Sequence, residues 1–396
     1  MVLTLWVTTA GRTPGGVPTT GRPAAGPRWW ARPPRRRGLT RCGPCRGALV
    51  VAALVAGVVV CAAADSSSRA AVPAGVVRLQ GSPEDIGREH GTRLAGPIRT
   101  MIGEYVRDDL APPWPGPGVL DRVRRMKAVV PEWYRRELAA CAQAAGIEED
   151  VLLYAQCEGD IKSLGGCTSY VALGPATHDG RMEIGRNFDY WGLRSTRECV
   201  TVLAVIPRPE EGYAFVAVGW AGILGGWTLY NERGLFVSNN LGGFSATNPD
   251  GIPTLILTRM LIQKAATLDD AVAIVRRGPR MRGQALVIGS AGDPGRGQAP
   301  GAAVIQYDAE RVEVAPAVAG MALHSSVGSQ PEPLLSVLGR PPRQPWEAIR
   351  SVGNSITLHS VAIRPQEGRM WVAHGRPSLA HEGPYVGYDL RALLAR

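Results

Sequence analysis

One stretch with the pattern of a β-hairpin constrains the fold of this 396-residue chain more than any other part of it. Residues 168–173 and 182–187 are rich in β-forming side chains, and the turn sequence HDG lies between them at 178–180. Cys167 stands at the start of the first segment, and the sequence GRNFD ends the second at 185–189. The pattern therefore predicts two consecutive strands with a cysteine at the start of the first.

Helical and β-rich regions are grouped along the chain. A possible strand at 76–79 is followed by mostly helical spacing up to about residue 165, and SPED at 82–85 has the order of an N-cap, a first-turn proline and acids. Beyond 165 the pattern changes to strands, with helices predicted at 254–265 and 267–277. The further predicted strands are 200–206, 213–218, 235–238, 285–289, 302–307, 312–316, 356–363 and 369–373. Because helices and strands are grouped and do not alternate, the sequence predicts an α+β fold.

The first 64 residues have the composition of a leader. Residues 1 to about 34 are rich in Pro, Gly and Arg, which predicts disorder. Residues 47–64 form an unbroken apolar run that follows basic residues and ends in three alanines, as an export signal does. The run is also about long enough for a short membrane anchor. We therefore expect an exported protein whose leader, 1–64, is either removed or retained as an anchor through 47–64.

The net charge of +10 lies almost entirely in this leader. No Asp or Glu precedes residue 47, whereas the arginines there are Arg12, Arg22, Arg28, Arg32, Arg35, Arg36, Arg37, Arg41 and Arg46. Without them the chain is nearly neutral. The sequence therefore gives no reason to expect a nucleic-acid partner.

Cys167 is the candidate nucleophile. An inert buried cysteine is the ordinary alternative, because free cysteine is among the most buried residue types. If the chain cuts itself between Gly166 and Cys167, however, the new terminus carries a thiol and a free α-amine on one residue. An α-amine has a pKa of about 7.7–8.0 and can act as the base of such a nucleophile. Arg186 would lower the pKa of the thiol if it lies near.

Several motifs carry a resemblance to known enzymes. CTS at 167–169, followed by GRNFDY at 185–190, resembles the N-terminal-nucleophile hydrolases. These include the penicillin (isopenicillin N) acyltransferases, the choloylglycine hydrolases with the penicillin V acylases, and the acid ceramidase-like amidases. AGILG at 221–225, NERGL at 231–235 and GSPEDIG at 81–87 are most similar to the penicillin acyltransferases.

The resemblance implies a four-layer αββα sandwich, in which two antiparallel sheets lie between helices. It also implies self-cleavage between Gly166 and Cys167, which would divide the chain into a small helical segment, 65–166, and a catalytic region, 167–396. The expected reaction cleaves or transfers the acyl group of a small-molecule N-acyl amide through a thioester on Cys167. Water as acceptor would make a hydrolase, and an amine would make an acyltransferase.

Four residues receive roles from the resemblance. Cys167 would be the nucleophile, Asp189 would hold its freed α-amine, Arg186 would support the thiolate and the substrate carbonyl, and Asn240 would donate a hydrogen bond to the oxyanion. The ordinary alternatives are an ion pair between Arg186 and Asp189 and a strand-end turn at Asn240. One position departs from the family, which has an asparagine near a histidine where this chain has Ser326. Its hydroxyl could substitute by donating a hydrogen bond.

Two other functions stay open at this level. One is an unprocessed papain-like hydrolase in which His324 or His359 acts as the base for Cys167. The other is an exported, catalytically inactive binding protein of the same fold, because the family asparagine is missing. No metal-binding spacing or phosphate loop occurs in the sequence, so no metal or cofactor is expected. The sequence leaves the oligomeric state open.

Overall fold

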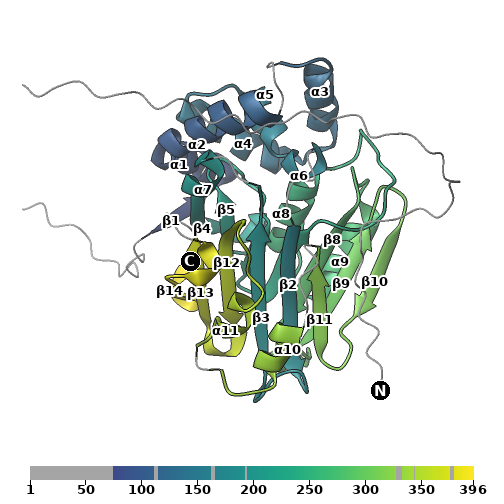
Figure 1. The fold of residues 1–396 in the computed structure, drawn as a ribbon. Helices are drawn as coiled ribbons and strands as arrows, with labels where there is room; N and C mark the ends of the chain where they lie inside the picture. The colour runs from purple at the N-terminus through teal and green to yellow at the C-terminus, as the bar shows by residue number, and fades with distance from the viewer. Residues whose placement is uncertain are drawn as a thin grey trace, which may run out of the picture. The chain divides into compact units, whose positions relative to one another are not determined.

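The predicted hairpin forms two adjacent inner strands of a six-stranded sheet (Figure 1). Its strands are β2 (Gly166–Gly174) and β3 (Gly180–Asp189). The strand order is β11-β2-β3-β12-β13-β14, and all neighbours run antiparallel. The other members are β11 (Met321–Ser325), β12 (Thr357–Arg364), β13 (Arg369–His374) and β14 (Val386–Asp389).

The structure is a computed structural model that describes residues 75–110, 115–161, 166–191, 194–326, 332–342, 344–374 and 379–396. The predicted leader, 1–64, lies outside these residues together with its apolar run at 47–64. No helix within the described ranges is long and apolar enough to cross a membrane. The boundaries expected at 64 and 166 remain predictions.

An eight-stranded sheet has the order β1-β4-β5-β6-β7-β8-β9-β10. Only β1 and β4 pair in parallel, and the other neighbours are antiparallel. The strands are β1 (Val76–Gly81), β4 (Val200–Pro207), β5 (Phe215–Trp220), β6 (Thr228–Asn231), β7 (Leu235–Asn240), β8 (Gln284–Ser290), β9 (Gly301–Tyr307) and β10 (Val312–Pro316).

The two sheets pack face to face, with β2 and β11 of the smaller sheet against β8 and β9 of the larger one. Helices α8 (Thr254–Lys264) and α9 (Leu268–Arg277) pack on the larger sheet. Helices α10 (Glu332–Leu338) and α11 (Glu347–Arg350) cover the smaller sheet. There they form a second apolar cluster that includes Tyr170, Leu334 and Ile349. The layers are therefore αββα.

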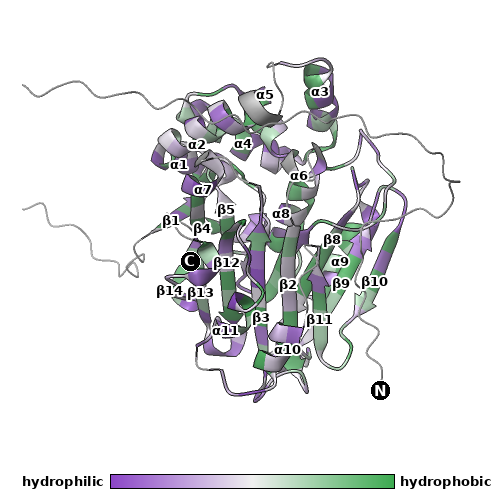
Figure 2. Cartoon of the chain, in the orientation of Figure 1, coloured by the Kyte–Doolittle hydropathy of each residue, from purple (hydrophilic) through white to green (hydrophobic). Residues whose placement is uncertain are grey.

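Helices of the N-terminal segment group together at one end of the sheets (Figure 1). They are α1 (Pro83–Arg93), α2 (Ala95–Thr100) with a π-helical continuation (Met101–Leu110), α3 (Val119–Val129), α4 (Glu132–Ala145), α5 (Glu149–Ala155) and α6 (Glu158–Ile161). Ser82 and Asp85 form the predicted N-terminal cap of α1 as a capping box. Figure 2 shows the mixed hydropathy of α3, which buries Val123 and Met126 among charged neighbours. Burial of such apolar stripes holds these helices on the rest of the protein.

The α+β class and the two-sheet arrangement predicted from the sequence are confirmed. Strands β6, β11 and β14 were not predicted, nor were α10, α11, α7 (Arg194–Glu198) and α12 (Leu390–Leu394). The sequence of β11 is MALHS, which lacks β-branched and aromatic residues, so its local strand signal is weak. One-turn 3₁₀ helices lie at Pro209–Glu211, Pro294–Arg296, Pro365–Glu367 and Ala380–Glu382.

Candidate active site

Cys167 lies at the beginning of β2, directly opposite the end of β3. In the register of this pair, Cys167 faces Phe188 and Gly166 faces Asp189. Cys167 is 4% exposed. The hairpin therefore brings together the cysteine and the aspartate that the sequence places 22 positions apart. Both ends of the Gly166–Cys167 bond lie in the ordered strand.

Ser326 contacts the backbone of Cys167 from the other side of β2. The Cys167 N–H donates to Ser326 Oγ over 2.9 Å, and the Ser326 N–H donates to the Cys167 carbonyl over 2.9 Å. These bonds continue the pairing of β11 with β2, in which Ser325 faces Thr168. The hydroxyl of Ser326 is thus hydrogen-bonded to the nitrogen that a cut before Cys167 would release.

Arg186 is fully buried between the two sheets. Its Nη1 donates to Ser169 Oγ over 3.1 Å and to Asn240 Oδ1 over 2.7 Å, and its Nη2 donates to the Asn239 carbonyl over 2.7 Å. Among the described residues it forms no ion pair, so the alternative of an Arg186–Asp189 pair is not what the structure contains. Burial raises the pKa of the Cys167 thiol, and the charge of Arg186 acts against that shift. Arg186 is therefore the local cation that favours a thiolate.

Asp189 is buried and only half satisfied. Its Oδ1 accepts from Thr357 Oγ1 over 2.6 Å, whereas its Oδ2 has no hydrogen-bond partner among the described residues. Burial raises the pKa of Asp189 to about 6, while hydrogen bonding by Thr357, the charge of Arg186 and the nearby side chain of Asn354 oppose the rise. A buried carboxylate with a free oxygen is a ready acceptor for an ammonium group.

Asn240 lies in the same cluster but with its amide turned away from the expected direction. Its Oδ1 accepts from Ser169 Oγ over 2.8 Å and from Arg186. Its Nδ2 donates to the carbonyls of Ser238 over 3.2 Å and Ala285 over 3.3 Å. The residue is therefore close to Arg186, and its oxyanion role stays a prediction.

The hydrogen bonds of both candidate histidines to other described residues go to groups other than the thiol. His324 Nε2 bonds to the Leu241 carbonyl over 2.7 Å. His359 Nε2 bonds to Thr228 Oγ1 over 2.9 Å, and its ring stacks on Phe188 at 5.0 Å between centroids. Burial lowers the pKa of both imidazoles. In the cross-strand register, Phe188 stands between His359 and Cys167, so this arrangement does not form a papain-like pair.

A cavity of about 30 Å³ opens beside Cys167. Aromatic rings border it at Phe188, Tyr190 and Trp227. Trp220 extends this cluster, with ring centroids 4.6 Å from Trp227 and 5.2 Å from Tyr190. The hydroxyl of Tyr105 lies 2.5 Å from that of Tyr190, so the N-terminal segment reaches the same cluster. One side of the cavity beside the thiol is therefore aromatic.

The glycine-containing stretch at 221–225 is held by buried polar side chains of the N-terminal segment. Gln156 Nε2 donates to the Gly222 carbonyl over 3.0 Å, and Gln156 Oε1 accepts from the Leu224 N–H over 3.0 Å. His90 Nε2 accepts from the Gly222 N–H over 3.1 Å. A side chain at Gly225 would collide with the Leu255 carbonyl, because an added Cβ would lie 2.0 Å from that oxygen. The stretch is thus fixed by contacts that cross the proposed cut.

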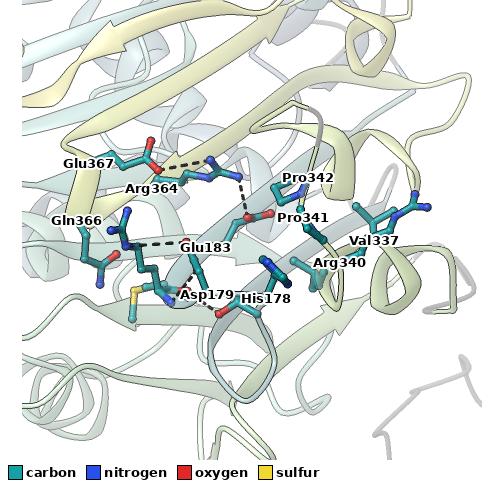
Figure 3. Close-up of a pocket in the computed structure, with 14 residues that line it drawn as sticks. His178, Asp179, Glu183, Val337, Arg340, Pro341, Pro342, Arg364, Gln366 and Glu367 are labelled. Carbon is teal, nitrogen blue, oxygen red and sulfur yellow. Dashed lines mark hydrogen bonds and ion pairs between the residues drawn. The ribbon is translucent and has the colours of Figure 1, made fainter.

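A second cavity, of about 140 Å³, lies at the turn end of the same hairpin (Figure 3). Figure 3 shows Arg364 between Glu183 and Glu367, to which it is paired at 3.3 Å and 3.4 Å. Cys167 stands at the opposite end of β2 from this turn. Among the residues that the structure describes, no three His, Cys, Asp or Glu side chains gather where they could hold a metal ion.

Residues 176–294 match the family described as acyl-coenzyme A:6-aminopenicillanic acid acyl-transferase. The predicted resemblance to penicillin acyltransferases is confirmed for this part of the chain. The matched residues include Arg186, Asp189 and Asn240, and Cys167 stands shortly before them. The match is a likeness to acyl-transferases over residues 176–294, and it does not include Cys167.

An uncharacterized protein from Archaeoglobus fulgidus is 26% identical over 271 residues, which cover 60% of this chain and 44% of that protein. The match thus spans less than half of that relative. Among solved structures, an N-acylethanolamine-hydrolyzing acid amidase ortholog from Caenorhabditis elegans has a TM-score of 0.39 at 17% identity, covering 50% of this chain and 93% of that one. Penicillin V acylase from Agrobacterium tumefaciens has a TM-score of 0.36 at 14% identity, covering 58% and 93%.

Several residues at the site were not singled out in the sequence. Thr357 bonds Asp189 from β12, and Asn239 and Gln284 line the small cavity. The sequence signal available for Asn239 was its position next to Asn240, which had been singled out. Thr357 and Gln284 are far from Cys167 in sequence, and only strand pairing brings them near.

Proposed function

We propose that this chain is a self-processing cysteine amidase or acyltransferase whose mature N-terminal residue is Cys167. The observation that carries the proposal is the environment of the Gly166–Cys167 bond. Ser326 Oγ accepts a hydrogen bond from the nitrogen of this bond. Asp189, whose Oδ2 has no partner among the described residues, lies opposite Gly166 in the strand pairing. The match to an acyl-transferase family supports the same chemistry.

Maturation would begin with attack of the Cys167 sulfur on the carbonyl carbon of Gly166. The carbon–nitrogen bond then breaks, and Gly166 is held as a thioester on the sulfur. The thiol proton ends on the released nitrogen, and Ser326 is positioned to relay it. Water hydrolyses the thioester, which leaves a carboxylate on Gly166 and a free thiol and α-amine on Cys167.

The mature enzyme would use the α-amine of Cys167 as its base. The amine takes the thiol proton, the thiolate attacks the acyl carbon of an N-acyl amide, and the proton passes to the leaving amine as the carbon–nitrogen bond breaks. Water or a second amine then releases the acyl group from the thioester. Asp189 holds the ammonium form, since its Oδ2 has no donor among the described residues of the uncut chain.

Stabilisation of the oxyanion is assigned to Asn240 and Arg186. In the uncut chain Asn240 Nδ2 makes only long bonds of 3.2–3.4 Å to its neighbours. We propose that it exchanges these for the oxyanion once the Gly166 carbonyl has left. Removal of one such donor typically costs a factor of 10² to 10³ in kcat.

Acylation of Cys167 by p-nitrophenyl esters, followed by mass spectrometry, tests the proposal. A family of esters with acyl chains of increasing size would label the mature fragment at Cys167 and release the acid on standing. Cys167→Ala should show no label. Cys199→Ala is the matched control, and it should be labelled like the wild-type protein. Absence of label on the wild-type protein at every chain length would mean an inactive protein of this fold.

Export remains part of the proposal. It is supported only by the sequence of residues 1–64, in which arginines precede an apolar run ending in alanines. N-terminal sequencing of protein recovered outside the cytoplasm should give a start near residue 65. Recovery of the whole chain with membranes would indicate that residues 47–64 stay as an anchor.

A further inference from the structure

Asp189 is held by a short turn, residues 354–357, that ends at the first residue of β12. This residue is Thr357, which faces Asp189 across the pair of β12 and β3. Its Oγ1 donates to Asp189 Oδ1 over 2.6 Å. Asp189 is 1% exposed and Thr357 is 4% exposed. A buried bond of this length is typical of a hydroxyl that donates to a charged carboxylate.

An irregularity in β12 places the hydroxyl there. The register pairs Thr357 with Asp189. It pairs His359 with Phe188, so two steps along β12 match one step along β3 and Leu358 is the extra residue. In a regular pairing Leu358 would stand opposite Asp189. Such a β-bulge re-aims the side chains beside it, and here it puts a hydroxyl opposite the carboxylate in place of a leucine.

The turn also fixes the backbone around both residues. The N–H of Tyr190, which follows Asp189, donates to the Ile356 carbonyl over 3.0 Å. The Thr357 N–H donates to the Asn354 carbonyl over 3.2 Å. Within the turn, Asn354 Oδ1 accepts from the Ile356 N–H over 2.9 Å. Both partners of the hydroxyl–carboxylate bond are therefore attached to the same turn.

The hydroxyl proton of Thr357 has one direction left to it by the turn. The Asn354 N–H donates to Thr357 Oγ1 over 3.1 Å. A hydroxyl has one proton, and a backbone N–H can only donate. The proton of Thr357 is therefore left for Asp189 Oδ1. The other carboxylate oxygen, Asp189 Oδ2, has no partner among the described residues, and Asp189 lines the cavity beside Cys167.

We propose that Thr357 is the positioning residue for Asp189, because its hydroxyl occupies Oδ1 and leaves Oδ2 for the α-ammonium of mature Cys167. This inference rests on the proposed function. Thr357 acts through Asp189 and exchanges no proton with the substrate. Without the hydroxyl, the carboxyl group is free to turn about its last side-chain bond, and its charged form loses the hydrogen bond that favours it.

The groups that act on the charge of Asp189 come from three strands. Arg186 on β3 supplies a positive charge that favours the ionised form. Cys167 on β2 and Tyr190 bring the other titratable groups at the cavity, and the remaining described residues that line it do not titrate. His359 on β12 has its pKa lowered by burial. Replacement of the threonine by valine keeps all four residues, so a change in the pKa of Asp189 reports the lost hydroxyl.

The first measurement is the titration of the Asp189 carboxyl group in the uncut Cys167→Ala protein. Carbon-13 NMR of protein labelled at the aspartate carboxyl carbon follows it, and the signal is assigned by its absence after Asp189→Ala. Thr357→Val keeps the shape of threonine without the hydroxyl. It should raise the pKa of Asp189, which is about 6, by about one further pH unit. Thr357→Ser keeps a hydroxyl and should leave this pKa unchanged.

Ser360→Ala is the matched control on the same strand. Ser360 is buried, and its hydroxyl donates to Asn187 Oδ1 on β3 over 2.6 Å. The control therefore removes the same kind of bond between the same two strands. It should leave the pKa of Asp189 unchanged.

The second measurement is the burst of p-nitrophenol from a p-nitrophenyl ester with the self-cleaved protein. Thr357→Val should acylate about tenfold more slowly than the wild-type protein, because a displaced carboxylate no longer holds the α-amine beside the thiol. Thr357→Ser and Ser360→Ala should stay within about threefold of the wild-type rate.

Three outcomes overturn the inference. They are an unchanged pKa of Asp189 in Thr357→Val, equal slowing of the burst in Thr357→Val and Thr357→Ser, and equal slowing in Thr357→Val and Ser360→Ala. The titration needs neither self-cleavage nor activity, so it also decides for a variant that stays uncut. A wild-type protein that is neither cut nor labelled refutes the proposed function, whereas labelling together with an unchanged pKa of Asp189 refutes this inference alone.

Discussion

The backbone N–H of Cys167 donates to the hydroxyl of Ser326 over 2.9 Å. The same serine also donates its own N–H to the Cys167 carbonyl over 2.9 Å. Ser326 therefore places a polar side chain against the nitrogen of the bond that we propose is cut. A serine can both accept from this nitrogen and return a proton to it.

Ser326→Ala should slow self-cleavage without preventing it. The variant loses one hydrogen bond of about 0.5–1.5 kcal/mol at the breaking bond, so the rate should fall roughly three- to tenfold. The measurement is the time course of fragment appearance after denatured protein is refolded. Ser325→Ala is the matched control, because its hydroxyl bonds Thr168 Oγ1 and not Cys167. Equal rates for Ser326→Ala and Ser325→Ala would remove Ser326 from the mechanism.

Much of the fold followed from local pattern, because the hairpin β2–β3 and the helices α8 and α9 carry strong periodic signals. Strand β11 was missed, since MALHS has little strand propensity and gains its order from pairing with β2. Cys167 and Arg186 could be named from their places on the predicted hairpin, whereas the role of Asp189 came from the resemblance to known enzymes. Thr357 and Gln284 could not, because their proximity depends on strands that pair across long stretches of sequence. The direction of the Asn240 amide is likewise set by tertiary contacts.

Asp189 should make the uncut protein less stable as the pH rises. Its pKa is raised in the folded state from 3.8 to about 6, so the folded protein holds this proton more firmly than the unfolded one. The resulting stabilisation is complete below about pH 4 and is lost as the pH passes through 6. A shift of this size corresponds to at most about 3 kcal/mol. Urea unfolding of Cys167→Ala at pH 4 and 7 measures the difference in the free energy of unfolding between the two pH values.

Adding Asp189→Asn to that variant should reduce the loss of stability between pH 4 and 7. Asp160 is the matched control, because burial also raises its pKa to about 6, yet it caps α8 through Thr254 and does not line the cavity. Asp160→Asn should therefore remove the part of the pH-dependent stability that comes from Asp160 and leave the part that comes from Asp189. An unchanged pH dependence in Asp189→Asn would contradict a buried, protonated Asp189.

The two proposed fragments should stay together after cleavage through the pair of Glu137 and Arg259. The carboxylate on α4 accepts two bonds from the guanidinium on α8, at 3.0 Å and 2.6 Å, and both side chains are buried. Glu137→Gln leaves a buried charge and should destabilise the protein by about 3–5 kcal/mol. Glu132→Gln on the same helix breaks an exposed pair with Arg135 and should cost less than about 1 kcal/mol. Similar losses in urea unfolding for both variants would argue against this pair as the link.

His324→Gln should leave acylation of Cys167 within about tenfold of the wild-type rate. The imidazole is bonded to the Leu241 carbonyl and is not the base in the proposed mechanism. Loss of the base in a papain-like pair would instead cost a factor of about 10³ or more. The burst of p-nitrophenol from an active ester measures the acylation rate. A loss of that size, with the fold intact by circular dichroism, would favour the histidine-dependent alternative.

Intact-mass spectrometry of the purified protein is the most direct test of the central claim. The account predicts two fragments in the wild-type protein, of which the larger begins at Cys167 and ends at Arg396. Cys167→Ala should give a single uncut chain. A wild-type protein that remains one chain while it hydrolyses amides at full rate would contradict the mechanism.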